Sequence, residues 1–174
     1  MTDPDVEICA AAMENAVTLS AVGCASFKAA YEGTAGAEDL LSHLETYFSV
    51  TAIEEELVMA GRRYLMALID GEATGFVKIR EGEQPAVIPG SSALELQQVY
   101  VLPDKQRHGV GGQLIEAVVD IARSENADGL WLSVWVDAPW AVSAYRKNGF
   151  KAVGTAAFRL GKTRYEDLLM WRSV

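Results

Sequence analysis

The chain has 174 residues, of which 50% are hydrophobic and 22% are charged, a composition typical of a folded globular protein. Its length favours a single domain, residues 1–174, with a core of useful size. The net charge of −9, from 15 Lys and Arg against 24 Asp and Glu, argues against a nucleic-acid partner, because phosphate backbones are bound by basic faces.

The N-terminal segment is predicted to form a strand over residues 6–11 and a helix over residues 15–31. It has no basic region ahead of its apolar residues, so we expect no secretory signal. No apolar run reaches the roughly 18 to 20 residues that cross a bilayer, so no membrane partner is expected. Cys9 and Cys24 form no CxxC pair and, with two scattered histidines, do not make the pattern of a metal site. We therefore expect a cytoplasmic protein without a disulfide or a metal.

The middle of the chain changes from a helical pattern to a strand pattern. Helices are expected over residues 37–48 and 51–59, where acidic residues in the first turn of the second helix suit its N-terminus. An Asp-Gly pair at residues 70–71 then separates two alternating segments, residues 64–69 and 75–79. Such a pair between alternating segments is a strong signal for a β-hairpin.

The second half of the chain begins with residues 81–93, whose two prolines and two glycines predict a mobile loop. A strand follows over residues 94–101, and its alternation breaks at Gln97-Gln98, where a β-bulge would fit. From Gly109 to about Arg123 apolar residues recur at helical spacing. The remaining predicted elements are a buried strand at residues 130–136, a helix from Pro139 to Asn148, and strands at residues 151–157 and 164–171. This order predicts an α+β domain with helices layered on a mixed sheet.

The segment KQRHGVGG, residues 105–112, combines basic side chains with three glycines between a strand and an amphipathic helix. A helix N-terminus presents about four unpaired N–H groups and a partial positive charge, and glycines let an anion approach them. We interpret the segment as a cradle for phosphate or pyrophosphate. A dinucleotide fingerprint would need glycine at Leu114, and a Walker A loop would need lysine at Gln113. A glycine-rich helix start without a ligand is the alternative interpretation.

Three segments in the same order, LELQQVYVLP, QRHGVGG and AYRKNGF, resemble the GCN5-related N-acetyltransferase (GNAT) superfamily over about residues 94–150. The resemblance implies a central mixed, mostly antiparallel β-sheet with splayed strands, flanked by helices, which binds acetyl-CoA. It also implies direct transfer of the acetyl group to a primary amine, with no metal and no covalent enzyme intermediate. Folds of this kind also allow a homodimer.

A looser likeness extends over nearly the whole chain. The segments YFSVTAIEEEL, LWLSVWV and GTAAFRLGKTRYEDLLM are similar to a bacterial subgroup of polyamine N-acetyltransferases that were first described as regulators of protease synthesis and sporulation. This likeness implies spermidine or spermine as the acceptor. The acidic surface fits such a partner, because negative charge attracts small cations.

The resemblance also implies roles for individual residues. The backbone of the strand around Val99 would pair with the pantetheine arm, and an N–H group there would stabilise the oxyanion. Tyr145 would stand near the thioester sulfur and protonate the leaving thiolate. The residues expected to contact coenzyme A are Val99, Tyr100, Val101, Gln106, Arg107, His108, Gly109, Val110, Gly111, Gly112, Ala138, Tyr145 and Lys147.

Residues for the acceptor are predicted from the chemistry of an amine, which must lose a proton before it attacks. Glu95 is the candidate base, with Gln97 or Tyr100 positioning a water molecule. For Glu95 an ordinary solvent-facing strand residue is the alternative interpretation. Trp135 is the tryptophan expected to approach the substrate.

One position departs from the pattern of the superfamily. Its members often carry asparagine seven residues before the tyrosine, where this chain has Ala138; the neighbouring Asp137 would cap the helix instead. Two alternatives to a small-molecule acetyltransferase therefore stay open. One is an acetyltransferase for a protein N-terminus or lysine, and the other is a non-catalytic regulator that binds acyl-CoA.

Overall fold

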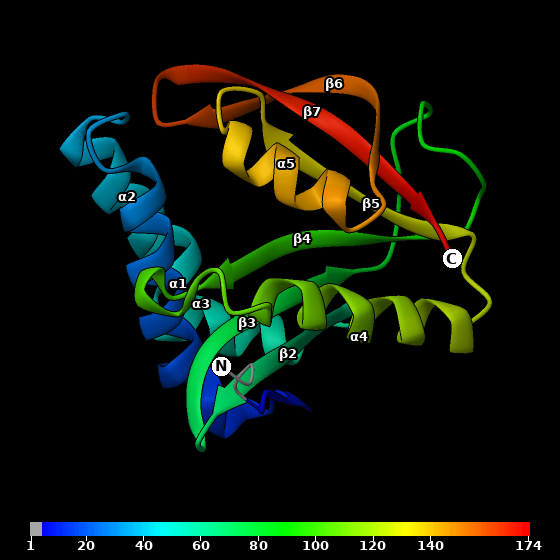
Figure 1. Cartoon of the computed structure of the whole chain (residues 1–174). Helices are drawn as coiled ribbons and strands as arrows, with labels where there is room; N and C mark the ends of the chain where they lie inside the picture. The colour runs from blue at the N-terminus through cyan, green and yellow to red at the C-terminus, as the bar shows by residue number, and fades with distance from the viewer. Residues whose placement is uncertain (1–4) are drawn as a thin grey trace.

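A seven-stranded sheet forms the centre of the protein, with strand order β1-β2-β3-β4-β5-β7-β6 (Figure 1). The structure is a computed structural model that describes residues 5–174. Residues 1–4, part of the segment from which we expected no secretory signal, lie outside the described residues. Each neighbouring pair of strands is antiparallel except β4 and β5, so the sheet is mixed and mostly antiparallel, as predicted.

The helices and strands follow the predicted order closely. In chain order they are β1 (Glu7–Ala10), the 3₁₀ helix η1 (Met13–Asn15), α1 (Ala16–Tyr31), α2 (Ala37–Phe48), α3 (Val50–Leu57), β2 (Arg62–Ile69), β3 (Glu72–Arg80), β4 (Ala93–Val101), the 3₁₀ helix η2 (Pro103–Lys105), α4 (Val110–Ser124), β5 (Gly129–Trp135), α5 (Pro139–Lys147), β6 (Lys151–Leu160) and β7 (Thr163–Ser173). None of these described helices is long and apolar enough to cross a membrane.

Two local predictions about the strands are confirmed. Asp70 and Gly71, with φ angles of 53° and 79°, form the two-residue turn between β2 and β3, and a positive φ at both positions is what a type I′ hairpin requires. In the next pair of strands Lys78 lies opposite Gln98 and Ile79 lies opposite Leu96. Gln97 is therefore the extra residue of a β-bulge, which bends β4 in its middle.

The strands β4 and β5 separate soon after they meet. They pair in parallel over three residues only, and the last pair is Glu95 and Trp131. Parallel neighbours require a crossover, and α4 supplies it. Beyond that pair the two strands move apart toward the ends of α1 and α2, as Figure 1 shows. This is the splay that the fold prediction included.

Helices cover both faces of the sheet. The apolar stripe of α4, which is Leu114, Ile115, Val118, Val119 and Ala122, is almost wholly buried against one face, and α5 adds Val142 to the same core. Each of the Leu, Ile and Val side chains contributes about 1.5–3 kcal/mol when fully buried. The helices α1, α2 and α3 form a second, aromatic-rich core on the other face. The site described below uses residues from both faces.

Residues 81–92 form a loop without helix or strand, as predicted, and side chains hold it in place. The amide of Gln84 donates to the carbonyl oxygens of Ile88 and Gly90, and its oxygen accepts from the N–H of Ala93. Asp128 accepts hydrogen bonds from the N–H groups of Ser91 and Ser92. Ile88 is buried under the loop. These contacts stand in for secondary structure in the segment, and its mobility stays a prediction.

Candidate functional site

The glycine-rich loop leads directly into the N-terminus of α4. Gly109 is the N-cap residue, its φ of 76° lies in the left-handed region, and no side chain caps it. A side chain at that φ costs about 1–2 kcal/mol, so glycine suits the position. The N–H groups of Val110, Gly111 and Gly112 fall in the first turn, where helices have no internal acceptor for them. The loop therefore leaves the first-turn amides of α4 without a side-chain cap, and their binding of an anion stays a prediction.

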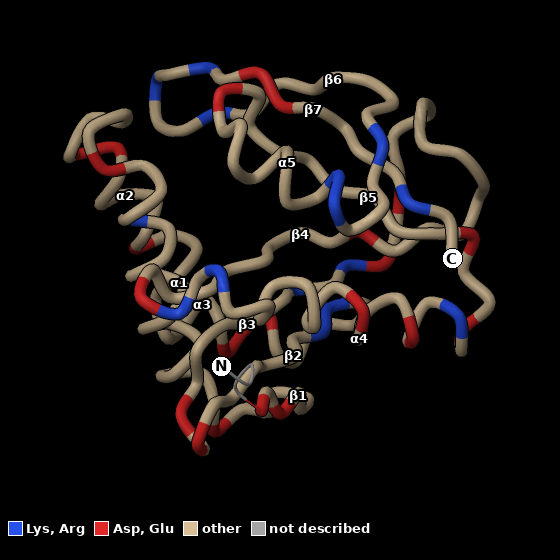
Figure 2. Tube along the Cα trace, in the orientation of Figure 1, with Lys and Arg blue, Asp and Glu red and all other residues tan. Residues whose placement is uncertain are grey.

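The side chains of the loop surround these amides. Gln106, Arg107 and His108 are exposed, and the basic residues of the turn before α4 appear blue in Figure 2. Gln106 Nε2 donates to the carbonyl oxygen of Val101 at 3.2 Å, and His108 Nδ1 lies 3.3 Å from the carbonyl oxygen of Lys105. These contacts hold the loop locally.

Val110 contributes to the site through its backbone alone. Its side chain is 1% exposed and belongs to the core beneath α4. Its N–H group, by contrast, is in the first turn of the helix. Any contact of this residue with the cofactor would therefore be made by its backbone N–H group and not by its side chain.

Three tyrosines converge where β4 and β5 have separated. Tyr31 ends α1, Tyr100 lies near the end of β4, and Tyr145 belongs to α5. Burial, with a smaller contribution from the neighbouring Tyr31, raises the pKa of Tyr145 to about 12. Burial also raises the pKa of Tyr100, with smaller contributions from both other tyrosines. Phe27 stacks on Tyr31 and meets Tyr100 edge-on, and the hydroxyl group of each of the three tyrosines is protonated at neutral pH.

The helix α5 brings Tyr145 toward the loop. Its ring meets Phe150 edge-on at a centroid distance of 5.8 Å. At the end of the same helix the side chain of Asn148 lies beside Gly112, where an added Cβ would be 3.4 Å from Asn148 Oδ1. The first turn of α4 and the last turn of α5 are therefore neighbours. Lys147 is exposed in that last turn.

The N-terminus of α5 departs from our expectation. Ala138 is the N-cap residue, and no side chain hydrogen-bonds to the first turn. Asp137 is exposed and does not cap the helix, because it lies one residue too early. The side chain of Ala138 is buried, so it offers only backbone groups at this end of the helix.

Glu95 lies at the vertex of the splay, not at its open end. It is 8% exposed, which excludes an ordinary solvent-facing strand residue, and it forms an ion pair with Arg80 of β3. Burial raises the pKa of its carboxyl group, while Arg80 lowers it. Two residues further along β4, the side-chain oxygen Oε1 of Gln97 is buried without a hydrogen-bond partner among the described residues.

Trp135 belongs to a group of aromatic rings on the side of the sheet that carries α1. Its ring stacks on Tyr31 at a centroid distance of 5.8 Å and meets Tyr165 edge-on at 5.5 Å. Asp167 lies directly opposite Trp135 in the pairing of β5 with β7. Tyr31, Tyr165 and Asp167 were not predicted as site residues. The alternation of side chains along the strand RYEDLLM places Asp167 on the same face as Tyr165. This pattern is the one signal in the sequence that could have grouped these two residues.

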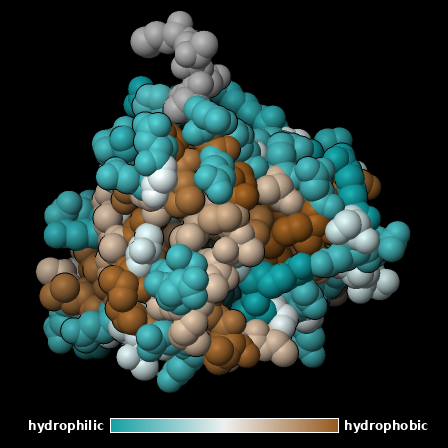
Figure 3. All heavy atoms as spheres, turned by 90° about the horizontal axis from the view of Figure 1, so that it is seen from below, coloured by the Kyte–Doolittle hydropathy of each residue, from teal (hydrophilic) through white to brown (hydrophobic). Residues whose placement is uncertain are grey.

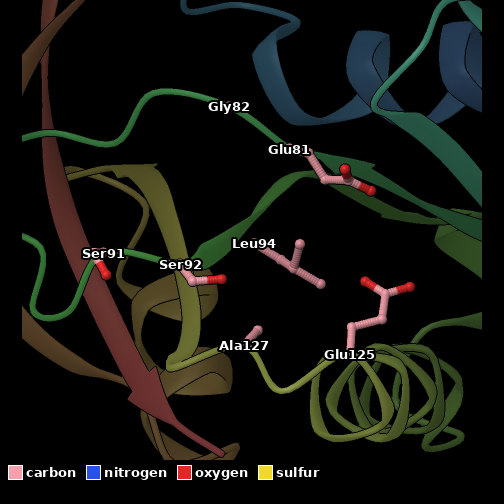
Figure 4. Close-up of a pocket in the computed structure, with 8 residues that line it drawn as sticks. Glu81, Gly82, Ser91, Ser92, Leu94, Glu125 and Ala127 are labelled. Atoms are coloured by element: carbon pink, nitrogen blue, oxygen red, sulfur yellow. The ribbon is translucent and has the colours of Figure 1, made fainter.

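A separate pocket of about 350 Å³ lies at the other end of β4. Figure 4 shows the carboxyl groups of Glu81 and Glu125 at its edge, and both form ion pairs with Arg63. Acidic walls disfavour a phosphate ligand. The pocket also lies on the opposite side of the β4–β5 contact from the tyrosines, so we assign the site to the splay. Among residues 5–174, no three His, Cys, Asp or Glu side chains gather to hold a metal ion.

Comparisons with known proteins agree with this geometry. A sequence model of the acetyltransferase (GNAT) family matches residues 38–150. An uncharacterised N-acetyltransferase of Mycobacterium tuberculosis is 30% identical over 162 residues, which are 93% of this chain and 99% of that protein. Streptothricin acetyltransferase of Streptomyces lavendulae is 31% identical over 94 residues, 53% of this chain and 46% of that protein.

The fold is shared with solved structures. The crystal structure of PaiA N-acetyltransferase from Thermoplasma acidophilum, in complex with coenzyme A, has a TM-score of 0.81 to this chain. It is 24% identical, and the alignment covers 98% of this chain and 99% of that one.

Proposed function

Because the chain belongs to the acetyltransferase (GNAT) family, and is thus an acyltransferase that uses acetyl-CoA, we propose that it acetylates a primary amine of a small cationic molecule. We also propose that residues 1–174 are one acetyltransferase domain that works in the cytoplasm. The observation that carries the proposal is the uncapped N-terminus of α4 beside the splay of β4 and β5. In this proposal the first-turn amides of α4 bind the pyrophosphate, with Arg107 and Lys147 adding positive charge.

The splay supplies backbone groups for the rest of the cofactor. Beyond Glu95 no residue of β4 pairs with β5, so the N–H and C=O groups on that edge around Val99 and Val101 have no partner in β5. Buried backbone groups require partners, and an extended amide-containing arm provides them. We propose that the pantetheine arm of acetyl-CoA occupies this edge, and that an N–H group near Tyr100 stabilises the oxyanion.

Tyr145 is the proposed donor to the departing sulfur. The thiolate has an ordinary pKa of about 8.5, so it leaves without full protonation. Burial raises the pKa of Tyr145 to about 12, so complete proton transfer to the thiolate would be uphill by about 4.8 kcal/mol, at 1.36 kcal/mol for each pKa unit. We therefore assign Tyr145 to stabilise the thiolate by a hydrogen bond as the carbon–sulfur bond breaks. The thiolate then takes its proton from water.

Deprotonation of the acceptor is the other demand of the reaction. An alkyl amine with a pKa of about 10.4 is unprotonated in about one molecule in 2,500 at pH 7, a cost of about 4.6 kcal/mol. Glu95 is the proposed base, and burial raises the pKa of its carboxyl group toward a value better matched to that task. Its position at the vertex and its bond to Arg80 mean that it acts through water. The side-chain oxygen of Gln97 is a partner for that water or for the amine.

A polyamine is the first candidate for the acceptor. The net charge of −9 attracts cations, and aromatic rings around Trp135 offer faces that a cationic chain can pack on. A second candidate is an amine of an antibiotic, on the ground of the partial likeness to streptothricin acetyltransferase. The same chemistry would acetylate a protein N-terminus or lysine.

Homodimerisation stays a prediction. Figure 3 shows hydrophobic patches on the lower face of the molecule, divided by hydrophilic side chains. Among residues 5–174, the exposed large apolar side chains are Met13, Val17, Leu41, Tyr47, Val58, Met59, Val87 and Trp140. Light scattering after size-exclusion chromatography measures the molar mass and decides the question.

The experiment that tests the proposed function is a panel of acceptors. The purified protein is mixed with acetyl-CoA and with polyamines, aminoglycosides, amino acids or peptides, and release of free thiol is followed. Thiol release that depends on an amine is the expected result. Tight binding of coenzyme A without thiol release from any member would favour the non-catalytic regulator instead.

A further inference from the structure

Asp167 of β7 is a buried carboxylate without a cation. It is 7% exposed, and Ser133 Oγ donates to its Oδ2 at 2.6 Å. The second oxygen, Oδ1, has no hydrogen-bond partner among the described residues. No Lys, Arg or His side chain in residues 5–174 forms an ion pair with it. Buried carboxylates in proteins are normally paired, and among residues 5–174 no cationic side chain pairs with this one.

Other buried charges of the protein show the contrast. The ammonium of Lys78, which is 5% exposed, is paired with Glu56. Glu95 is paired with Arg80. Asp167 alone among the buried charged side chains of the described residues has a single neutral partner, and burial raises the pKa of its carboxyl group. An ammonium group beside Oδ1 would offset the free-energy cost of burying the charged carboxylate.

The surroundings of Asp167 fit an alkyl ammonium. Trp135 lies directly opposite it on β5, and Tyr165 lies two residues earlier on the same face of β7. Tyr31 of α1 stacks on Trp135 and meets Tyr165 edge-on, so its ring belongs to the same group. The three rings contact one another at centroid distances of 5.5–6.4 Å. Aromatic faces attract cations and pack on methylene groups.

Ser133 connects the splay between β4 and β5 with Asp167 and the aromatic rings around it. Ser133 lies on β5 beyond the last pair with β4, and its side chain is exposed although it is bonded to a buried carboxylate. Tyr31, which stacks on Trp135, also stacks on Phe27 at a centroid distance of 4.5 Å, and Phe27 meets Tyr100 of β4 edge-on at 6.4 Å. The aromatic group around Asp167 is therefore linked through Phe27 to the part of β4 where we place the thioester.

We propose that Asp167 determines specificity by binding a second, non-reacting ammonium group of the acceptor, with Tyr31, Trp135 and Tyr165 packing on the chain between the two nitrogens. A carboxylate that held the reacting nitrogen would stabilise its protonated form, which cannot attack. The ammonium bound by Asp167 must then be a different nitrogen, and the favoured acceptors are diamines and polyamines. This inference rests on the proposed function and names the acceptor class for it.

The test compares diamines with monoamines of equal length. For α,ω-diamines of three to eight carbons and the matching alkyl monoamines, kcat/KM is measured by thiol release from acetyl-CoA. We expect the best diamine to exceed its matched monoamine by about 10- to 100-fold, the value of a hydrogen bond to a charged group. Asp167→Asn should reduce this ratio about tenfold or more while the KM for acetyl-CoA changes little.

The control is Glu166→Gln, which removes the same charge from the exposed neighbour on β7 and should preserve the ratio. Equal kcat/KM for diamines and monoamines in the wild-type enzyme would overturn the proposal, and this comparison needs no variant to fold. The proposal would also be overturned if Asp167→Asn lowered kcat/KM equally for the diamine and its matched monoamine. Loss of the diamine-to-monoamine ratio in Glu166→Gln would overturn it as well.

A binding measurement separates this inference from the proposed function. Calorimetric titration of the best diamine, or of 1,4-diaminobutane, into protein saturated with coenzyme A needs no turnover. Binding at least tenfold tighter to the wild type than to Asp167→Asn is expected even if no thiol is released, and equal binding overturns the inference. Absence of thiol release with every amine would instead overturn the proposed function.

Discussion

Glu95 of β4 and Trp131 of β5 are the last pair of residues that joins the two halves of the sheet. Glu95 also bonds Arg80 on the other side, so its carboxyl group is fixed at the vertex of the splay. The proposed base, Glu95, lies where β4 and β5 still pair. The proposed donor to sulfur, Tyr145, lies on α5 beside the part of the splay where the strands have separated. The two roles can be separated by substitution.

Replacement of Glu95 by glutamine tests the base. We expect kcat/KM for the amine to fall about 10²-fold at pH 7, and the deficit to shrink as pH approaches the amine pKa of about 10.4, where unprotonated acceptor no longer limits the rate. The pH profiles of the two enzymes measure this. Arg80→Gln is the matched control, because it breaks the same ion pair and keeps the carboxylate. Parallel profiles at every pH would assign Glu95 a structural role only.

Replacement of Tyr145 by phenylalanine tests the donor to sulfur. The ring keeps its packing on Phe150, so the fold should be preserved, while the hydroxyl group is lost. We expect kcat to fall about 10²-fold, because the thiolate then leaves without a hydrogen bond. The Kd for coenzyme A, measured by calorimetry, should stay within about twofold. A variant with wild-type kcat would remove Tyr145 from the reaction.

The local parts of the fold were predictable because the signals for them lie within a few residues. The Asp70-Gly71 turn needs two residues with positive φ, and the bulge at Gln97 shows as a break in alternation. The start of α4 at the glycine-rich loop was predictable for the same reason, since a loop and the helix that follows it are continuous in the chain. Tyr145 and the splay were expected from the family resemblance.

The acceptor side of the site was largely missed. Tyr31 and Asp167 are 136 positions apart, and only the folded sheet and α1 bring them together. His43 gave no sign that its ring would stack on Phe27 at a centroid distance of 4.4 Å. Contacts between distant segments depend on topology and packing. The periodic patterns that predict individual helices and strands therefore do not predict which of these elements meet.

Gly109→Ala tests the cradle. The residue has a φ of 76°, so a methyl group there strains the backbone by about 1–2 kcal/mol and stands next to the amides that bind the anion. We expect coenzyme A to bind about tenfold more weakly by calorimetry. Gly33→Ala is the control, because it has a φ of 83°, open space around it and no part in the loop. Equal affinity for coenzyme A in both variants would argue against the cradle.

Ala138→Asn tests the departure from the family pattern. Asparagine is a good N-cap and alanine a poor one, so α5 should gain about 1 kcal/mol and the melting temperature should rise about 2–4 °C. If the family's use of this position holds here, affinity for coenzyme A rises as well, because the amide can donate a hydrogen bond. Ala138→Ser, which caps without an amide, should show the thermal gain alone. An unchanged affinity in Ala138→Asn would mean that the chain binds the cofactor without this contact.

His43 makes the stability of the protein depend on pH. Its ring lies among Phe27, Tyr47 and Phe48, and burial lowers its pKa below the ordinary 6.5. The unfolded state therefore binds a proton more readily than the folded state, and the stabilisation is present above pH 6.5 and lost as pH falls through the lowered value. Buried Glu95 and Asp167 have raised pKa values and act in the opposite direction, so only a comparison isolates the histidine. Urea unfolding at pH 7.5 and pH 5 should show a larger loss in the wild type than in His43→Phe, and equal losses would contradict the assignment.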